Sequence, residues 1–457
     1  MKALLVYPLD RDFMPPSVPP LGLFYVATAL KSAGHEVTIL DLNVERQEGQ
    51  DKLEFLLKDQ QFGLVGVSSL ITQYKKVKIL GKLIKSIAPN TPLIMGGAGA
   101  TSIANLYLEH CFADVVCLGE GEDTIVELAD LISNKKSYCD CQGIAYKGND
   151  GEVVTTSMRP LIEDVDSITF PDFSMCEKID TYIENYLFRH GKRRGISVLT
   201  TRGCPNRCVY CMCNFGRKLR TRSLDNIFQE INLLVDKYKI EHVHFLDDTF
   251  MIVKDYCKEL SARMKKEFPD LTWSANARAN MVSQENLKFM ADNNCISLAY
   301  GIESGSPKIL KYMKKNFTTK HASNAIKWTR EAGINLRAYF MIGMPCETEE
   351  TIRESVQFCK DNLVGGEFFF LTPIPGTEVY QTVIENGIIQ NEDLYAEHLG
   401  EVRDFLVNVT QMENEELFTL KENAEREIIA HLKKHNIPIP TSTRTDPRET
   451  AKILPTF

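Results

Sequence analysis

The chain has 457 residues, of which 44% are hydrophobic and 25% charged, with a net charge of −8. This length predicts two or three domains, and the hydrophobic and charged shares are those of a soluble globular protein. The absence of a long apolar run favours a cytoplasmic protein without a membrane partner. The negative charge disfavours a nucleic-acid partner, because phosphate binding needs clustered Lys and Arg. The thirteen cysteines are an odd number and far below the roughly 8 to 10% of a disulfide scaffold, so a cysteine cluster is first a metal or redox candidate.

The first 134 residues alternate short β-branched runs with amphipathic stretches. Buried strands are expected at 2–7, 36–42, 63–69, 92–97 and 113–119, and helices near 21–33, 51–60, 73–88, 101–110 and 122–133. Five such units predict a doubly wound, Rossmann-like parallel sheet over residues 1–140, with ligands bound at the carboxyl ends of its strands.

Residues 141–194 are expected to form a hairpin and a linker. The stretch 142–157 alternates around the turn residues at 149–151, and a polar, proline-marked connector follows from Pro160 to about Gly195. Its basic run at 189–195 is expected to be a solvated linker rather than a binding site.

A second alternation begins at 195 and continues to about 395. Six strands are expected at 195–204, 241–248, 271–278, 296–304, 335–343 and 367–373. Six βα units indicate a partial (β/α)6 barrel, whose chemistry would lie at the carboxyl ends of its strands. Residues 396–457 are expected to be a helical segment, with a helix at 413–434, followed by a mobile proline-rich tail.

Three cysteines, Cys204, Cys208 and Cys211, follow the first barrel strand with the spacing C-x3-C-x2-C. Three thiolates in a tight loop can hold one face of a four-iron cluster and leave one iron open for another ligand. Zinc is the main alternative metal, but a structural zinc site needs four closed ligands, and no downstream Cys or His pair has the required spacing.

This motif, with the aromatic Tyr210 before its last cysteine and a six-unit barrel behind it, resembles the radical SAM superfamily. The resemblance implies a [4Fe-4S] cluster on Cys204, Cys208 and Cys211, whose open iron chelates S-adenosylmethionine (SAM). An electron from a low-potential donor such as flavodoxin or ferredoxin would cleave SAM to a 5'-deoxyadenosyl radical. Cys213 lies outside the motif and is expected to be a packing residue, although ligation of the cluster is its alternative.

Later strand ends match the superfamily in order and supply the expected SAM contacts. The amino group is assigned to the end of the second strand, the carboxylate to the third, the ribose to the fourth and the adenine to the fifth. The alternatives are a helix cap for one of the aspartates and surface ion pairs for Arg278 and Glu303. With Tyr210, the candidate SAM residues are Asp247, Asp248, Arg278, Glu303, Ser304 and Gly343.

The first domain resembles the cobalamin-binding domain that precedes many radical SAM enzymes. Its Ser-x-Leu and Gly-Gly elements and a Gly-Glu-Gly turn stand at three successive strand ends. The implied cobalamin residues are Ser68, Leu70, Gly96, Gly97, Gly119, Glu120 and Gly121. The loop at 8–22 contains no histidine for the cobalt, so the resemblance implies cobalamin without a protein imidazole ligand. His35, His242 and His244 are interpreted as structural residues.

The combined resemblance predicts a cobalamin-dependent radical SAM methyltransferase acting on a small molecule or peptide. The methyl group would reach an unactivated carbon or a phosphinate phosphorus through methylcobalamin. The alternative is an oxidative cyclase or ring-rearranging enzyme with the same cofactors but no methyl transfer. Methylthiolation is disfavoured because the first cysteine is Cys111, which leaves no set of three N-terminal cysteines for a second cluster. A non-catalytic corrinoid carrier would leave the cysteine motif unused.

Overall fold

The computed structural model describes residues 1–10, 15–186, 193–400 and 405–438. These residues divide into two compact units that cut across the expected linear boundaries. Unit 1 comprises 1–197, 214–240 and 392–400, and unit 2 comprises 198–213, 241–391 and the residues from 401 onward. The domain boundaries at 140, 194 and 395 therefore stay predictions, while two short segments beyond them, 214–240 and 392–400, pack with the N-terminal part.

Unit 1 is built on a seven-stranded sheet in the order β2-β1-β3-β4-β5-β6-β7. The pairs among the first five strands are parallel, as expected for a doubly wound fold. The predicted hairpin is present and joins the same sheet, because β6 pairs antiparallel with both β5 and β7. The strands are β1 (Lys2–Tyr7), β2 (Glu36–Asp41), β3 (Leu64–Ser68), β4 (Leu93–Gly96), β5 (Val115–Cys117), β6 (Ile144–Lys147) and β7 (Val153–Thr155).

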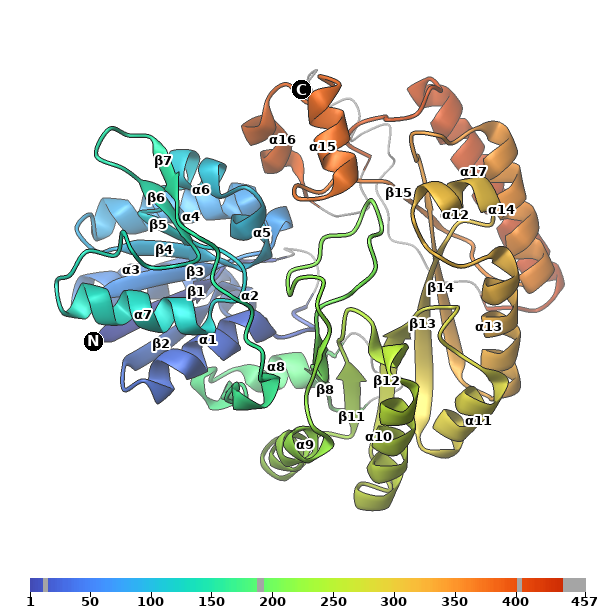
Figure 1. The fold of residues 1–457 in the computed structure, drawn as a ribbon, viewed down its shortest axis with the longest axis horizontal. Coiled ribbons are helices and arrows are strands. Elements are labelled where there is room, and N and C mark those ends of the chain that lie inside the picture. The colour runs from blue at the N-terminus through green and yellow to red at the C-terminus, as the bar shows by residue number, and fades with distance from the viewer. Residues whose placement is uncertain (11–14, 187–192, 401–404, 439–457) are drawn as a thin grey trace. The chain divides into compact units, whose positions relative to one another are not determined.

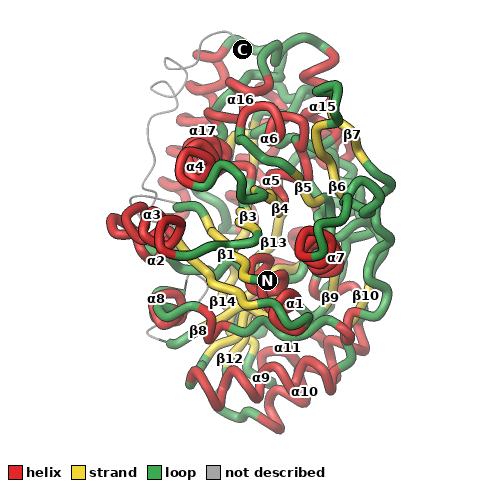
Figure 2. Tube along the Cα trace, turned by 90° about the vertical axis from the view of Figure 1, so that its left-hand side faces the viewer, coloured by secondary structure: helices red, strands yellow, loops and turns green. Residues whose placement is uncertain are grey.

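Helices cover both faces of this sheet (Figure 2). Helix α1 (Leu21–Ser32) lies beside α7 (Glu122–Ser133), and α3 (Gly49–Asp59) lies beside α4 (Tyr74–Ile87). Their apolar faces and the strands enclose a core that includes Leu5, which is 2% exposed. The remaining helices of unit 1 are α2 (Leu42–Glu45), α5 (Gly97–Ser102), α6 (Ala104–His110), α8 (Ile179–Glu184), α9 (Leu224–Tyr238) and α16 (Glu392–His398).

The second sheet has six strands in the order β15-β14-β13-β12-β11-β8, as the predicted partial barrel requires. The pairs from β11 to β15 are parallel. Figure 1 shows α10, α11, α13 and α14 along the outer side of these strands. The strands are β8 (Gly195–Val198), β11 (His242–Phe245), β12 (Thr272–Ala277), β13 (Cys295–Glu303), β14 (Asn335–Ile342) and β15 (Phe368–Phe370).

The helices of unit 2 follow the strands in alternation, and the last one packs on α14. It begins and ends at the residues predicted within one position, because its apolar positions recur with helical spacing and bury Leu417, Ile428 and Leu432. The helices are α10 (Lys254–Glu267), α11 (Gln284–Asp292), α12 (Pro307–Tyr312), α13 (Thr319–Glu331), α14 (Glu349–Asn362), α15 (Glu378–Glu385) and α17 (Asn414–Lys434). The two-residue strands β9 (Thr201–Arg202) and β10 (Arg220–Thr221) pair with each other in a separate small sheet.

Local differences from the predicted elements have simple causes. The helix expected at 101–110 is interrupted at Ile103, whose φ of −138° is not helical. The linker contains α8, whose Tyr182 is buried and donates a 2.7 Å hydrogen bond to Asp41 in β2. Most of the basic run at 189–195, residues 11–14 of the first loop and the tail from 439 onward lie outside the described residues.

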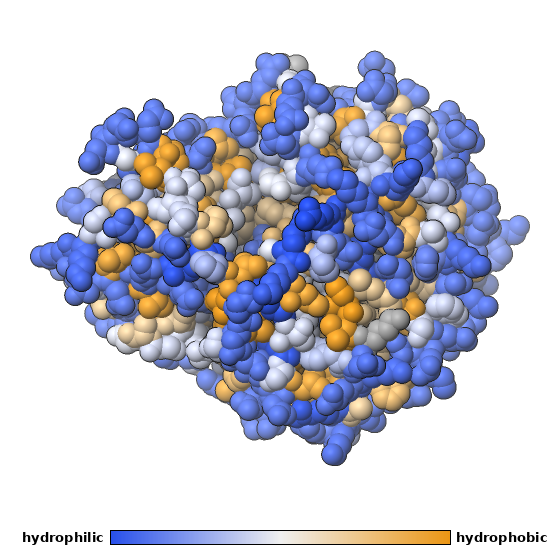
Figure 3. All heavy atoms as spheres, viewed as in Figure 1, coloured by the Kyte–Doolittle hydropathy of each residue, from blue (hydrophilic) through white to orange (hydrophobic). Residues whose placement is uncertain are grey.

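No helix of the described residues is long and apolar enough to cross a membrane. Hydrophilic side chains cover most of the face shown in Figure 3, in keeping with the charged share of the composition. His242 and His244 are buried as expected for structural residues: both rings bind the hydroxyl of Ser274, each at 2.8 Å.

Candidate functional site

The loop with the three motif cysteines lies in unit 2, between β8 and β11 in sequence. Cys204 Sγ lies 3.0 Å from Thr249 Oγ1, just beyond β11. Arg278 Nη1, just beyond β12, donates to Cys208 Sγ at 3.6 Å. The carboxyl ends of successive strands therefore meet the cysteine loop, as the barrel topology predicts.

Cys211 and Cys213 close this loop. The pKa of Cys211 is raised to about 12 by burial first and then by the negative charges of Cys208, Asp248, Cys204 and Cys213, so the other three thiols lie within electrostatic range of Cys211. Cys213 Sγ lies 3.8 Å from Asp248 Oδ2 and 3.9 Å from the carbonyl oxygen of Cys204. The fold brings the three expected ligands together and leaves Cys213 beside them, where its packing role stays a prediction.

The two aspartates after β11 occupy different environments. Asp247 is buried and accepts the backbone N–H groups of Thr200 at 2.6 Å and Thr201 at 2.9 Å. Burial is the largest effect on its pKa, which rises to about 6 although these hydrogen bonds oppose the shift. Asp248 is exposed and approaches Cys213. Asp247 thus holds the start of the cysteine loop, and Asp248 is the carboxylate that remains at the mouth of the barrel.

Arg278 links the cysteine loop to the segment after β13. Besides Cys208, its guanidinium binds the carbonyl oxygen of Lys315 and lies 5.9 Å from the ring centre of Phe317. Its Nε is buried without a hydrogen-bond partner among the described residues. An unsatisfied guanidinium N–H beside the candidate cluster ligands fits the predicted contact with the SAM carboxylate.

A buried trio of Tyr210, Glu303 and Lys315 lies at the end of β13. Tyr210 Oη donates to Glu303 Oε1 at 3.0 Å, while Lys315 Nζ lies 3.0 Å from the same hydroxyl and 3.2 Å from the same carboxylate oxygen. Glu303 adopts a left-handed backbone with φ of 68°, a strained conformation for a residue with a side chain. Sequence reasoning found Tyr210 and Glu303 but missed Lys315, which lies twelve positions later in a run of lysines that looks solvated.

Ser304 and Gly343 are the other two candidate SAM residues, and they differ in whether they could contact a ligand. Ser304 is buried, with its hydroxyl 3.0 Å from Ser355 Oγ and accepting the Ser306 N–H at 3.0 Å. Gly343 has φ of 102°, and the nearest atom to a side chain placed there would be 3.8 Å away, on Leu371. Gly343 therefore leaves space at the end of β14, whereas the hydroxyl of Ser304 is already used within the loop.

Glu347 is a second residue that sequence reasoning missed, in the turn after β14. It is buried, accepting the Gly343 N–H at 3.3 Å and the Thr351 hydroxyl at 2.7 Å. Burial raises its pKa to about 7 against the effect of these hydrogen bonds. In the sequence it is the first of three glutamates at 347, 349 and 350, and local rules do not distinguish it from the acidic residues that commonly begin a helix.

Replacing Glu347 with Gln is expected to change how stability depends on pH. The folded protein holds a proton on Glu347 up to about pH 7, whereas the unfolded chain releases it near its ordinary pKa of 4.5. Stability is therefore lost as pH rises between these values, by up to ~3 kcal/mol, and E347Q should recover part of that loss at pH 8 but not at pH 4.5. Urea unfolding at both pH values measures the difference. E349Q, at an exposed carboxylate, is the control, and an equal shift of E347Q at both pH values would contradict the assignment.

The expected cobalamin residues lie at the carboxyl edge of the first sheet. The Ser69 N–H donates to the Gly96 carbonyl at 3.1 Å, which joins the loops after β3 and β4. Gly97 has φ of 90°, and a Cβ at this position would lie 2.6 Å from the Ser69 carbonyl oxygen. Only glycine fits at position 97, where the loops after β3 and β4 pass close to each other. The close approach of these two loops therefore explains the second glycine of the Gly-Gly pattern.

Apolar groups are exposed at the same edge. Leu70, which follows β3, is 45% exposed, and Met158 is 57% exposed. Gly119 has φ of 77°, and the nearest atom to a Cβ there would be Met158 Cε at 3.7 Å. Small residues and exposed apolar side chains at the carboxyl edge of a parallel sheet fit a large flat cofactor such as a corrin.

Glu120, expected as a cobalamin contact, is instead held by Arg220. The two side chains are 4% and 2% exposed and form an ion pair of 2.7 Å, while the Ile162 N–H donates to the same carboxylate at 3.0 Å. Gly121 caps α7 and is exposed only in part. The buried pair fastens the segment that follows the cysteine loop in sequence to the loop after β5, within unit 1.

Helix α16 extends unit 1 with a part of the chain that the sequence assigned to the end of the barrel. Asp393 accepts a 2.6 Å hydrogen bond from Tyr74 in α4 and pairs with Lys78 at 2.7 Å. Lys78 also pairs with Glu397 at 2.7 Å. These contacts place α16 beside the short helical turn that follows Leu70.

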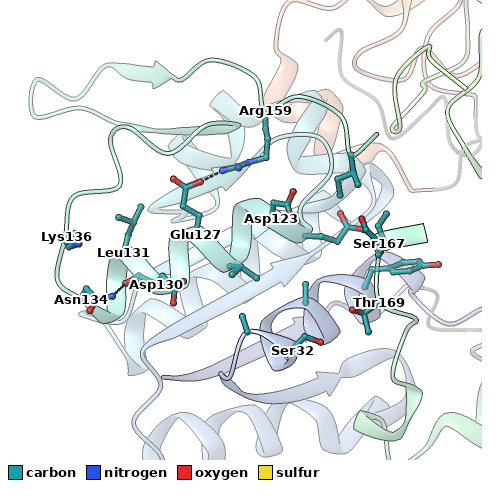
Figure 4. Close-up of a pocket in the computed structure, with 17 residues that line it drawn as sticks. Ser32, Asp123, Glu127, Asp130, Leu131, Asn134, Lys136, Arg159, Ser167 and Thr169 are labelled. Carbon is teal, nitrogen blue, oxygen red and sulfur yellow. Dashed lines mark hydrogen bonds and ion pairs between the residues drawn. The ribbon is translucent and has the colours of Figure 1, made fainter. Parts of the chain in front are cut away.

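Unit 1 also contains a cavity of about 610 Å³ between α1, α7 and residues 159–169 (Figure 4). Its α7 wall carries several carboxylates, and Arg159 reaches Glu127 across it while donating to Thr124 at 3.0 Å. None of the candidate cobalamin residues lines this cavity. It is therefore separate from the carboxyl-edge site.

Two family models match the chain in the order expected. The model described as B12 binding domain matches residues 14–129, and that of the radical SAM superfamily matches residues 198–359. The candidate cobalamin residues fall within the first match, and the candidate cluster and SAM residues fall within the second.

Curated relatives are similar over most of the chain. A protein of Pyrococcus horikoshii described as an uncharacterized methyltransferase is 32% identical, covering 85% of this chain and 84% of the relative. The cytidylyl-2-hydroxyethylphosphonate methyltransferase of Streptomyces wedmorensis is 29% identical, covering 86% and 83%. An anaerobic magnesium-protoporphyrin IX monomethyl ester cyclase of Cereibacter sphaeroides is 28% identical, covering 80% and 60%.

The solved structure of TsrM from Kitasatospora setae, a radical SAM methyltransferase with cobalamin and a [4Fe-4S] cluster bound, is also similar. The TM-score is 0.75 at 20% identity, covering 97% of this chain and 92% of that one. At this identity the likeness establishes the shared fold.

Proposed function

Because the chain belongs to the cobalamin-dependent radical SAM enzymes, with a [4Fe-4S] cluster, SAM and cobalamin as its cofactors, we propose that it is a methyltransferase whose methyl group comes from SAM. The acceptor is an unactivated carbon, or a phosphinate phosphorus, of a small molecule or peptide. A low-potential flavodoxin or ferredoxin supplies the electrons.

The observation that carries the proposal is similarity over more than four fifths of both chains to two relatives described as methyltransferases, the uncharacterized one at 32% identity and the cytidylyl-2-hydroxyethylphosphonate enzyme at 29%. The residues of both candidate sites support it. Three cysteines gather at one mouth of the barrel, and glycines that tolerate no side chain or leave open space stand at the carboxyl edge of the first sheet.

Roles can be proposed for the chain's own residues. Cys204, Cys208 and Cys211 hold the cluster, and when bound the cluster supplies the electron that cleaves SAM while cobalamin relays the methyl group. Arg278 pairs with the SAM carboxylate through its unsatisfied guanidinium, and Asp248 accepts from the amino group. These contacts fix the orientation of SAM, which favours a single cleavage geometry.

The segment that follows Cys213 contributes to the proposed cobalamin site. Arg220 in that segment neutralises Glu120, so the loop after β5 presents the glycines on either side of Glu120 rather than a free carboxylate. We therefore propose that Gly119 and Gly121 contact cobalamin and that Glu120 fixes their loop.

Product analysis with labelled SAM tests the proposal. The reconstituted enzyme, supplied with cobalamin, a low-potential reductant and a substrate, should release both 5'-deoxyadenosine and S-adenosylhomocysteine. The label of the SAM methyl group should appear in the product. Deoxyadenosine without S-adenosylhomocysteine would contradict methylation and leave radical chemistry intact.

The cyclase relative favours a second candidate with the same cofactors, in which the substrate radical is oxidised and closes a ring without methyl transfer. The same experiment separates the two. A cyclase would give a product lighter by two hydrogens and no labelled methyl group.

A further inference from the structure

The inner face of the second sheet carries an arginine that the proposed cofactor sites do not use. On β14, Phe340 and Ile342 are buried toward the helices, and the ring of Phe340 lies 6.2 Å from that of Phe358 in α14. Side chains alternate between the two faces of a strand, so Arg337 and Tyr339 lie on the opposite, inner face.

Strand register extends this inner face across the sheet. Ala299 is paired with both Asn276 on β12 and Arg337 on β14, and Gly301 is paired with Tyr339. The ring of Tyr339 lies 6.0 Å from that of Phe369 on β15. The inner-face positions defined by these pairings are His242, His244, Thr272, Ser274, Asn276, Ser297, Ala299, Gly301, Asn335, Arg337, Tyr339, Met341 and Phe369.

These inner-face positions contain one guanidinium and no carboxylate. Arg337 is exposed and makes no hydrogen bond or ion pair with the described part of the chain, and neither does the side-chain amide of Asn276. The positive charge of Arg337, after the larger effect of burial, lowers the pKa of His244 to about 3. Arg337 is on β14 and His244 is on β11, with β13 and β12 between them. The electrostatic effect of Arg337 on His244 therefore acts across the inner face of the sheet.

The same face leads to the candidate SAM residues. A side chain at Gly301 would collide with the Glu303 carboxylate and lie 3.4 Å from Lys315 Nζ. The Glu303 carboxylate and Lys315 Nζ therefore lie in front of Gly301, one inner-face position beyond Ala299, which is paired with Arg337. The buried trio and Arg337 thus lie along the same inner face of the sheet.

We infer that the substrate carries an anionic group, a phosphonate or phosphate ester or a carboxylate, which Arg337 binds inside the barrel with help from Asn276 and Tyr339. The inference rests on the proposed function and specifies its substrate class. An unpaired guanidinium offers a planar pair of donors suited to such oxyanions, and a neighbouring amide and phenol complete their hydrogen bonds. A cationic substrate would be repelled by this charge, and a neutral substrate would form no ion pair with it.

Four probes that share a ring and differ in their head group test the inference: phenylphosphonate, benzoate, benzyl alcohol and benzylamine. Binding to the enzyme loaded with cluster, cobalamin and SAM is measured by calorimetry or by saturation-transfer NMR. Phenylphosphonate, benzoate or both should bind at least tenfold more tightly than the neutral and cationic probes. Preference for the phosphonate assigns a phosphorus oxyanion, and preference for benzoate assigns a carboxylate.

Variants locate the binding site. R337Q should weaken binding of the anionic probe at least tenfold, and R337K should retain part of it, with iron content and cobalamin absorption unchanged. R353Q removes an arginine on the exposed side of α14, where it pairs with Glu349, and should bind the probe as the wild type does. No preference for anions in the wild type, or equal binding by R337Q, would overturn the inference. Because the assay needs no turnover, its result is independent of whether methylation is observed.

Discussion

Single replacement of Cys204, Cys208 or Cys211 by Ala is expected to reduce both bound iron and 5'-deoxyadenosine formation to background. In a four-iron cluster with three cysteine ligands, each cysteine holds one iron and the fourth iron stays open for SAM. Loss of one cysteine therefore leaves a second iron without a protein ligand. Three thiols that lie together in the fold would otherwise repel one another as thiolates, so the iron is what makes this arrangement favourable. Iron and sulfide content, the visible spectrum and deoxyadenosine yield measure the effect.

Cys213 is the matched control for these variants. It lies within the same loop, 3.9 Å from the Cys204 carbonyl oxygen, and stands outside the C-x3-C-x2-C motif. C213A should retain the iron content and deoxyadenosine yield of the wild type. Loss of iron in C213A would make the fourth sulfur a ligand and remove the open coordination site on which the proposed function depends.

Replacement of Lys315 with Met is expected to destabilise unit 2 by about 3–5 kcal/mol, because it leaves the Glu303 carboxylate buried without a positive partner. Lys315 is 4% exposed and Glu303 is 8% exposed, so water compensates little of this charge. Both tryptophans, Trp273 and Trp328, lie in unit 2, and their fluorescence during urea unfolding reports on that unit. SAM affinity should fall together with stability.

Two further variants separate the buried pair from general damage. K315M combined with E303Q removes both charges and should recover much of the stability but not the SAM affinity, which a double-mutant cycle quantifies. K314M changes the adjacent lysine, which pairs with Glu378 at the surface, and should cost under ~1 kcal/mol. If K314M and K315M were equally destabilised, the buried trio would have no special role in stability.

The sequence alone was sufficient for the order of strands and helices and for the cysteine motif. Parallel strands buried on both faces produce short apolar runs, and these matched β1 and β3 within one or two residues. The three cysteines were found because their function depends on local spacing within one loop. The glycines after β4 were found because a backbone crossing excludes a side chain at Gly97.

Contacts between side chains far apart in the sequence could not be predicted in this way. Lys315 resembles its neighbour Lys314, and only the fold buries one of them against Glu303 while the other pairs at the surface. Glu120 stands in a turn that resembles a cofactor loop, yet Arg220, one hundred positions later, occupies its carboxylate.

What the sequence determined by itself is therefore the class of fold, the family and the cluster motif, since each depends on periodicity or on spacing within a few residues. The tertiary structure decided which charges are buried and which are available. It placed segments 214–240 and 392–400 with the N-terminal sheet, engaged Asp247 and Glu120 in structural contacts, and left Arg337 unpaired on the inner face of the barrel. The physical reason is that charge compensation depends on distance in space, and residues far apart in sequence meet only when the strands are paired in register.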